Sequence, residues 1–94
     1  MPVRGRRDAR LSPEEAFANA LRRARKQGEL SQEQLGFASG YHRTYISMLE
    51  RAEMNPSLRT ILSISAALNI PAAKLVADVE RLLGGSWSRE TAQP

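Results

Sequence analysis

The sequence predicts an all-α fold, a single domain of five helices. Two observations predict this class. No stretch alternates apolar and polar residues for long enough to form a strand. Prolines, glycines and capping residues divide the 94 residues into segments whose apolar residues have helical spacing. Residues 12–83 are therefore expected to form one domain, with a flexible basic arm over residues 1–11 and a flexible tail over residues 84–94.

The first helix is expected to begin after Ser12 and to run to about Lys26. Ser12 and Glu15 have the spacing of a capping box, and Pro13 suits the first helical position. Gly28 then ends the helix. The residues expected to be buried along it are Phe17, Leu21 and Ala24.

A glycine turn joins the next two expected helices. Ser31 and Gln34 form a second capping box, which opens a short helix over residues 32–39. Gly40 permits a tight left-handed turn into a third helix over about residues 43–51. Two short helices joined in this way indicate a helix-turn-helix at about residues 31–51. The residues expected to face inward from the first of the two are Leu30, Leu35 and Ala38.

Two further helices complete the domain. The motif NPSL stops the third helix, and Ser57 can cap a fourth. The fourth helix has helical spacing at Leu58, Ile61, Leu62, Ser65 and Leu68. A fifth helix is expected from about Ala72 to Leu83, with Gly84 and Gly85 ending it.

The fifth helix carries more apolar side chain than one short domain needs. Its apolar residues are Leu75, Val76, Val79, Leu82 and Leu83. Some of them must pack on the fourth helix. We expect the more C-terminal ones, Val79, Leu82 and Leu83, to form the interface of a homodimer.

The composition excludes several kinds of site. With no cysteine and one histidine, disulfides, thiol catalysis and zinc-finger ligation are excluded or nearly so. We therefore expect no enzyme, no metal, no cofactor and no small-molecule ligand. The sequence also has neither an apolar run of the roughly 20 residues that cross a bilayer nor a secretory signal, so a cytoplasmic protein without a membrane partner is expected.

The positive charge is concentrated in the first two-thirds of the chain. The formal net charge is +4 and the sequence pI is about 10.3. Residues 60–94 hold equal numbers of basic and acidic residues, so residues 1–59 carry the whole excess. A surface that binds a polyanion would need this asymmetry, although solubility alone also accounts for it.

The third helix is expected to have a polar side opposite the side that packs in the core. At about 100° per residue, Arg43, Thr44, Ser47 and Arg51 fall on one side and Tyr45, Ile46 and Leu49 on the other. A short helix with arginine, threonine and serine near its N-terminus suits the major groove of DNA, where arginine pairs with guanine and threonine touches a thymine methyl. The sequence therefore predicts that this side faces DNA.

Three stretches within residues 18–83 carry a family resemblance: LRRARKQGELSQEQLGFASG, YHRTYISMLERA and NPSLRTILSISAALNI. They resemble the Cro/repressor-type helix-turn-helix family, also called the Xre family, whose fold is lambda repressor-like. Within it, HRTYISMLERAEMNPSL is most similar to the controller proteins of restriction-modification systems. The resemblance implies a transcriptional regulator that binds a partly palindromic operator in double-stranded DNA as a homodimer.

The resemblance also implies residue roles, carried over by position. Bases would be read by Arg43, Thr44 and Ser47. The DNA backbone or the groove edge would be held by Gln32, Tyr45, Arg51 and Asn55. Arg25 and Glu50 would form a structural ion pair between the first and third helices. The sequence departs from the family pattern at three places. Ala52 stands where a glycine usually ends the helix, and His42 stands at the N-cap. Glu53 and Met54 stand where relatives often carry a basic residue that contacts a phosphate.

Two other functions remain open from the sequence. Helix-turn-helix folds also occur in modules that bridge partner proteins and in antitoxins, because a fold does not determine a function. Specific binding to duplex DNA would separate a regulator from a bridging module. Trp87, alone in the expected tail, either covers a helix end or contacts a partner.

Overall fold

The computed structural model describes residues 11–84 and residue 87. The described part consists of five helices without a strand: α1 Pro13–Gln27, α2 Gln32–Ser39, α3 Arg43–Glu50, α4 Leu58–Ala67 and α5 Ala72–Leu83. The all-α prediction is confirmed, with α1 ending one residue later than expected and α3 one residue earlier. Residues 1–10 of the expected arm and all of the expected tail except Gly84 and Trp87 lie outside the described residues.

Hydroxyl caps fix the beginnings of three helices. The Ser12 hydroxyl accepts a hydrogen bond from the Glu15 N–H at 3.1 Å, and the Glu15 carboxylate accepts one from the Ser12 N–H at 2.9 Å. Ser31 and Gln34 form the same reciprocal pair ahead of α2. Ser57 caps α4 through the Thr60 N–H at 3.1 Å. Each such cap is worth about 1 kcal/mol, so local sequence determines where these helices start.

Two glycines make the turn between α2 and α3. Gly40 has φ 84°, a left-handed conformation that glycine adopts without steric cost. Gly36 is buried in α2, where an added Cβ would lie 2.6 Å from the carbonyl oxygen of Tyr41. The two helices therefore approach more closely than any larger residue at position 36 would allow.

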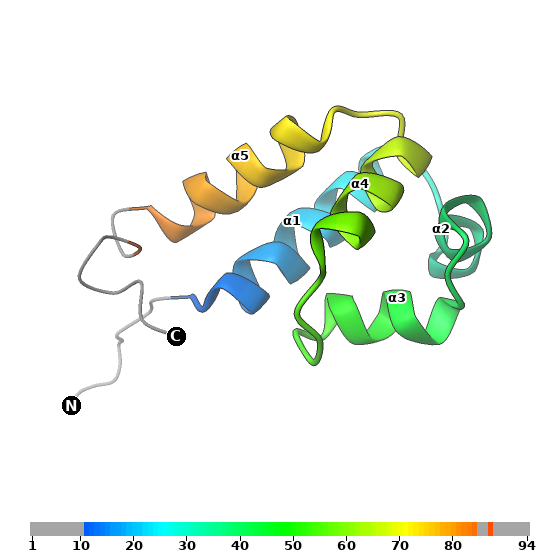
Figure 1. Cartoon of the computed structure of the whole chain (residues 1–94), viewed down its shortest axis with the longest axis horizontal. Coiled ribbons are helices and arrows are strands. Elements are labelled where there is room, and N and C mark those ends of the chain that lie inside the picture. The colour runs from blue at the N-terminus through cyan, green and yellow to red at the C-terminus, as the bar shows by residue number, and fades with distance from the viewer. Residues whose placement is uncertain (1–10, 85–86, 88–94) are drawn as a thin grey trace.

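The helices surround one core. Figure 1 shows α1 and α5 side by side along the molecule, with α2 and α3 together at one end. All five helices contribute to the buried cluster, which comprises Phe17, Ala20, Leu21, Leu35, Ile46, Leu49, Ile64 and Leu75. Among the described residues, no single helix is long and apolar enough to cross a membrane. Only α4 and α5 taken together reach that length and composition, as a pair bent by 111°.

One side chain expected to face inward is exposed, and the helical spacing of α4 does not by itself mark its buried side. Ala38 is exposed, because Leu35 and Gly36 form the buried side of α2. Leu58 and Leu62 share the helical spacing of α4, yet they are 71% and 52% exposed. The core instead takes the side of α4 that carries Thr60, Ile64 and Ser65, and Leu62 lies about 160° around the helix from Ile64.

Three helix ends use a left-handed residue that is not glycine. The residues are Glu29 with φ 59°, Ala52 with φ 60° and Asn69 with φ 59°. Ala52 therefore adopts the conformation of the glycine that it replaces in the family pattern, at a cost of roughly 1 kcal/mol. After α1, the left-handed residue is Glu29, while Gly28 stays right-handed with φ −82°.

Candidate nucleic-acid interface

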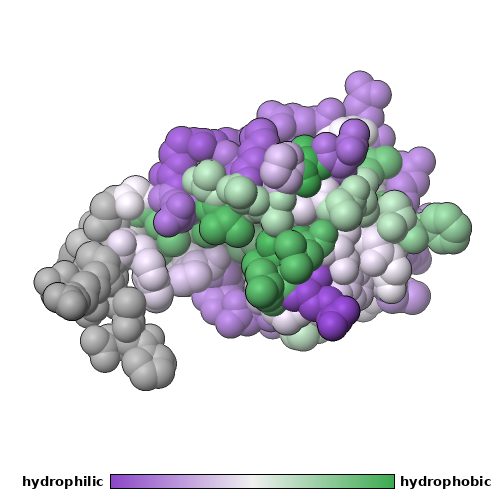
Figure 2. Space-filling model, turned by 45° about the horizontal axis from the view of Figure 1, so that its top comes forward, coloured by the Kyte–Doolittle hydropathy of each residue, from purple (hydrophilic) through white to green (hydrophobic). Residues whose placement is uncertain are grey.

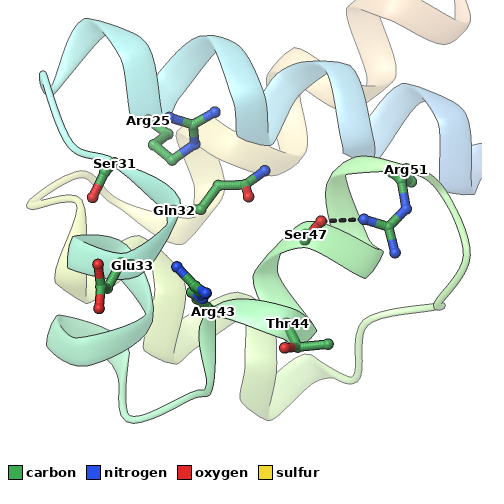
Figure 3. Close-up of a pocket in the computed structure, with 8 residues that line it drawn as sticks. All are labelled: Arg25, Ser31, Gln32, Glu33, Arg43, Thr44, Ser47 and Arg51. Carbon is green, nitrogen blue, oxygen red and sulfur yellow. Dashed lines mark hydrogen bonds between the residues drawn. The ribbon is translucent and has the colours of Figure 1, made fainter.

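An open groove of about 560 Å³ lies between the start of α2 and the exposed side of α3. Figure 3 shows its lining side chains, which come from both helices and from the end of α1. They are Arg25, Ser31, Gln32, Glu33, Arg43, Thr44, Ser47 and Arg51. The structure thus brings together all three expected base-reading residues and two of the expected backbone contacts. The lining carries three arginines and one glutamate, an excess of positive charge that favours an anion, while Glu50 and Glu53 beside the lining pair with Arg25 and Arg51.

The exposed side of α3 is held in place by its opposite side. Ile46 and Leu49 are fully buried at 0% exposure. Arg43 and Thr44, the first two residues of the helix, are exposed, and Ser47 is half-buried one turn further on. Rotating α3 would expose two large aliphatic side chains, so the polar side keeps a fixed direction.

His42 caps α3. Its Nδ1 accepts a hydrogen bond from the Thr44 N–H at 3.0 Å. Only an unprotonated ring nitrogen accepts, so the cap requires the proton of the neutral ring to sit on Nε2. The cap fixes the end of α3 from which Arg43 and Thr44 project.

Glu50 connects α3 to the two helices before it. Its carboxylate, on a residue only 3% exposed, accepts hydrogen bonds from Arg25 Nε at 2.6 Å and Arg25 Nη2 at 2.9 Å. Gln32 Nε2 donates to the same carboxylate at 3.0 Å. Arg22 donates to the Glu50 main-chain carbonyl and holds its Nε 3.9 Å from Oε1. One buried carboxylate therefore joins α1, α2 and α3.

These contacts keep Glu50 charged. Burial alone would raise the pKa of Glu50, but the hydrogen bonds from Arg25 and Gln32 and the charges of Arg25 and Arg22 outweigh it, so the pKa is lowered from its ordinary 4.5. The hydrogen bond between Arg25 and Glu50 also raises the pKa of Arg25. Two arginines act on one carboxylate, so the cluster remains net positive beside the groove.

Of the other expected DNA contacts, Gln32 lines the groove, whereas Tyr45 and Asn55 lie outside it. Gln32 lines the groove, but one of its amide hydrogens is engaged by Glu50. Tyr45 is half-buried outside the groove lining, with its hydroxyl 3.3 Å from Thr60 Oγ1 and its ring 5.0 Å from that of Tyr41. Asn55 is exposed and borders a separate apolar hollow.

Four residues of this region were not predicted from the sequence to take part in the site. Ser31 and Glu33 line the groove, Arg22 joins the Glu50 cluster, and Glu53 binds Arg51. Arg22 had a usable signal, because it lies three residues before Arg25 on the same side of a helix. The contact of Glu53 with Arg51 had no such signal, since Glu53 follows the end of α3, where no helical spacing applies.

Two short helices, a glycine turn and a positively charged groove beside the second helix define a helix-turn-helix protein. A family model described as helix-turn-helix matches residues 21–75, and the chain belongs to this helix-turn-helix family. The chain is similar to the control protein C.SmaI of Serratia marcescens, with 45% identity over 62 residues that cover 66% of this chain and 74% of that protein.

Solved structures agree with this assignment. The restriction-modification controller protein C.AhdI of Aeromonas hydrophila is 40% identical with a TM-score of 0.65, over 66% of this chain and 94% of that one. The controller protein C.Esp1396I was solved as a tetramer in complex with its natural 35 base-pair operator. It is 20% identical with a TM-score of 0.72, over 78% of this chain and 96% of that one, and so shows the shared fold alone.

The Glu50 cluster predicts a defined acid sensitivity. The folded-state pKa of Glu50 is lowered, so its contribution to stability is present above the ordinary value of 4.5 and is lost as the pH falls through the folded-state pKa. Glu50→Gln should remove this part of the acid slope. It should also cost about 3–5 kcal/mol near neutral pH, because Arg25 loses its buried partner.

Urea unfolding between pH 7 and pH 3 measures both effects. Glu33→Gln, at an exposed position in the groove, is the control for loss of one carboxylate. An acid slope in Glu50→Gln equal to that of the wild type would show that the cluster does not hold Glu50 ionised.

Proposed function

We propose that this chain is a sequence-specific DNA-binding transcriptional regulator that binds a partly palindromic operator in double-stranded DNA as a homodimer. The observation that carries the proposal is the groove, in which cationic and hydroxyl side chains cover the exposed side of a short helix whose other side is locked in the core. An α-helix about 10–12 Å wide fits the major groove of B-DNA, about 12 Å wide.

Three side chains of α3 are the proposed base readers. Arg43 lies at the N-terminal end of the helix, where helix-turn-helix proteins contact base edges, and its planar fork matches the O6 and N7 acceptors of guanine. Thr44, beside it, suits a thymine methyl. Ser47, one turn further on, can bond to a base edge through its hydroxyl.

The remaining contacts are proposed for the DNA backbone and the groove edge. Gln32 is the first residue of α2, where the helix dipole and free N–H groups favour a phosphate. Arg51 follows the last turn of α3 at the other end of the groove, and we assign it to the groove edge because its guanidinium is bound by Glu53 and Ser47. Tyr45 and Asn55 lie outside the groove lining, so we assign them to the flanking backbone.

The operon that is controlled is proposed from the relatives. The identities of 45% with control protein C.SmaI and 40% with controller protein C.AhdI favour control of a restriction-modification operon. Endonuclease and methyltransferase genes adjacent to the gene for this chain would support this assignment, and their absence would oppose it.

We place the homodimer interface on the side formed by α4 and α5. Figure 2 shows apolar side chains gathered on this side. Within the single chain, the expected interface residue Leu83 is already covered at 8% exposure, and Val79 and Leu82 are half-buried. Leu58, Leu62 and Val76 expose more, at 71%, 52% and 41%. We therefore centre the interface on these three, with Val79 and Leu82 at its edge.

Direct readout by Arg43 has a specific signature. Arg43→Ala should weaken operator binding by about 1–3 kcal/mol per half-site and relax the preference at one symmetric base position. Arg23→Ala removes the same charge from an exposed position on α1 outside the groove, and should leave the base preference intact. Binding selection on randomised duplexes compares the two variants.

Two outcomes of this selection would oppose the proposal. An Arg43→Ala variant that keeps the wild-type preference at every position contradicts direct readout. A wild-type protein that selects no sequence at all would favour the protein-bridging alternative.

The interface assignment predicts which charges break the dimer. A variant with Leu62→Asp and Val76→Asp should sediment as a folded monomer at micromolar concentration, because two buried charges would oppose association. Phe37→Asp, at a 91% exposed phenylalanine on α2, should remain dimeric. If Val79→Asp alone dissociates the dimer while the double variant does not, the interface lies on the C-terminal half of α5 instead.

A further inference from the structure

Arg51 is held by two partners on the exposed side of α3. Its Nε donates to Glu53 Oε2 at 2.8 Å and its Nη2 donates to Glu53 Oε1 at 3.0 Å. Its Nη1 donates to the hydroxyl of Ser47, the bond drawn in Figure 3. The three side chains thus form a connected series of hydrogen bonds that runs from the loop after α3 onto the proposed base-reading side.

Glu53 binds the N–H donors of Arg51 that a phosphate would otherwise bind. A guanidinium has five N–H donors, and a pair of parallel donors is what binds two oxygens of a phosphate or a carboxylate. Glu53 already fills one such pair. The hydrogen bond with Arg51 lowers the pKa of Glu53 and raises that of Arg51, so both partners are charged near neutral pH.

We propose that Glu53 is a specificity-determining residue, whose carboxylate holds Arg51 over Ser47 on the reading side of α3 and away from the DNA phosphates. The proposal rests on the proposed function, because it assumes that Ser47 faces a base. It adds a role to a residue that lies outside the groove lining and carries the charge opposite to that expected at a DNA surface.

The held arginine changes what Ser47 can recognise. The Ser47 oxygen accepts from a cation, which makes it a poorer acceptor and leaves its O–H free to donate. A donor in the major groove matches guanine O6 and N7, adenine N7 or thymine O4, and does not match the amino group of cytosine. Glu53 and Arg51 together therefore bias the position read by Ser47 against cytosine.

Without Glu53, Arg51 would increase the affinity for any DNA sequence instead of the discrimination between sequences. A released arginine side chain at a groove edge would bind phosphates, and phosphate contacts carry no base information. Removing the negative charge would also strengthen binding to every sequence alike. Glu53 therefore lowers general affinity and raises discrimination between sequences.

Glu53→Gln tests this assignment, with binding to operator and to unrelated duplex measured over a range of salt concentrations. Unrelated duplex should bind more tightly, and its log affinity against log salt should steepen by about 0.9, the increment for one additional neutralised phosphate. The ratio of operator to unrelated affinity should fall about two- to tenfold, the range carried by one net hydrogen bond. Selection on randomised duplexes should show weaker preference at the position read by Ser47.

Two variants separate this mechanism from a plain charge effect. Glu80→Gln removes the same charge from an exposed position on α5 and should leave the ratio and the selected sequence unchanged. In a Ser47→Ala background, Glu53→Gln should cause no further loss of preference at the Ser47 position, because the residue through which it acts is gone.

The outcomes distinguish this inference from the proposed function. If the wild type selects an operator and Glu53→Gln selects it with the same ratio and the same preference, the inference is wrong and the proposed function stands. If the wild type selects no sequence, the proposed function is wrong and the inference falls with it.

Discussion

The ion pair between Arg25 and Glu50 is the interaction on which the rest of this structure depends. A buried carboxylate accepts two hydrogen bonds from α1 and one from α2, and it belongs to the last residue of α3. Buried ion pairs contribute little net stability, because desolvation offsets much of the attraction. The Arg25–Glu50 pair instead fixes the orientation of α3, because α3 cannot shift along or around its axis without separating charges that are shielded from water.

The other constraints act on the same helix. The left-handed turn at Gly40 sets where α3 begins, the His42 cap fixes its first turn, and Ile46 and Leu49 hold one side in the core. The polar side is therefore presented as a rigid surface whose side chains need little reorganisation to meet a ligand. Positive charge around Glu50 and in the groove attracts a polyanion. The hydroxyl and guanidinium groups on α3 can then form directional hydrogen bonds with base edges.

The sequence was sufficient for features that depend on neighbouring residues. The capping boxes at Ser12 and Ser31 and the turn at Gly40 are encoded within a few positions, so the helices were predicted almost to the residue. The exposure of Leu58 and Leu62 was not predictable in this way, because it depends on which side of α4 meets α2 and α5. For the same reason helical spacing placed Arg43, Thr44, Ser47 and Arg51 on one side of α3 but could not predict the contact of Arg51 with Glu53, which lies in the loop after α3.

Replacing the Arg25–Glu50 pair by apolar residues of similar volume tests most directly whether the pair orients α3 for reading DNA. In an Arg25→Met, Glu50→Leu double variant, folding stability should stay close to that of the wild type or rise, because the desolvation cost disappears with the charges. The ratio of operator to unrelated duplex affinity should nevertheless fall, since α3 loses its fixed orientation. A folded double variant that keeps the wild-type ratio would show that the Arg25–Glu50 pair does not orient α3 and is only one packing contact among many.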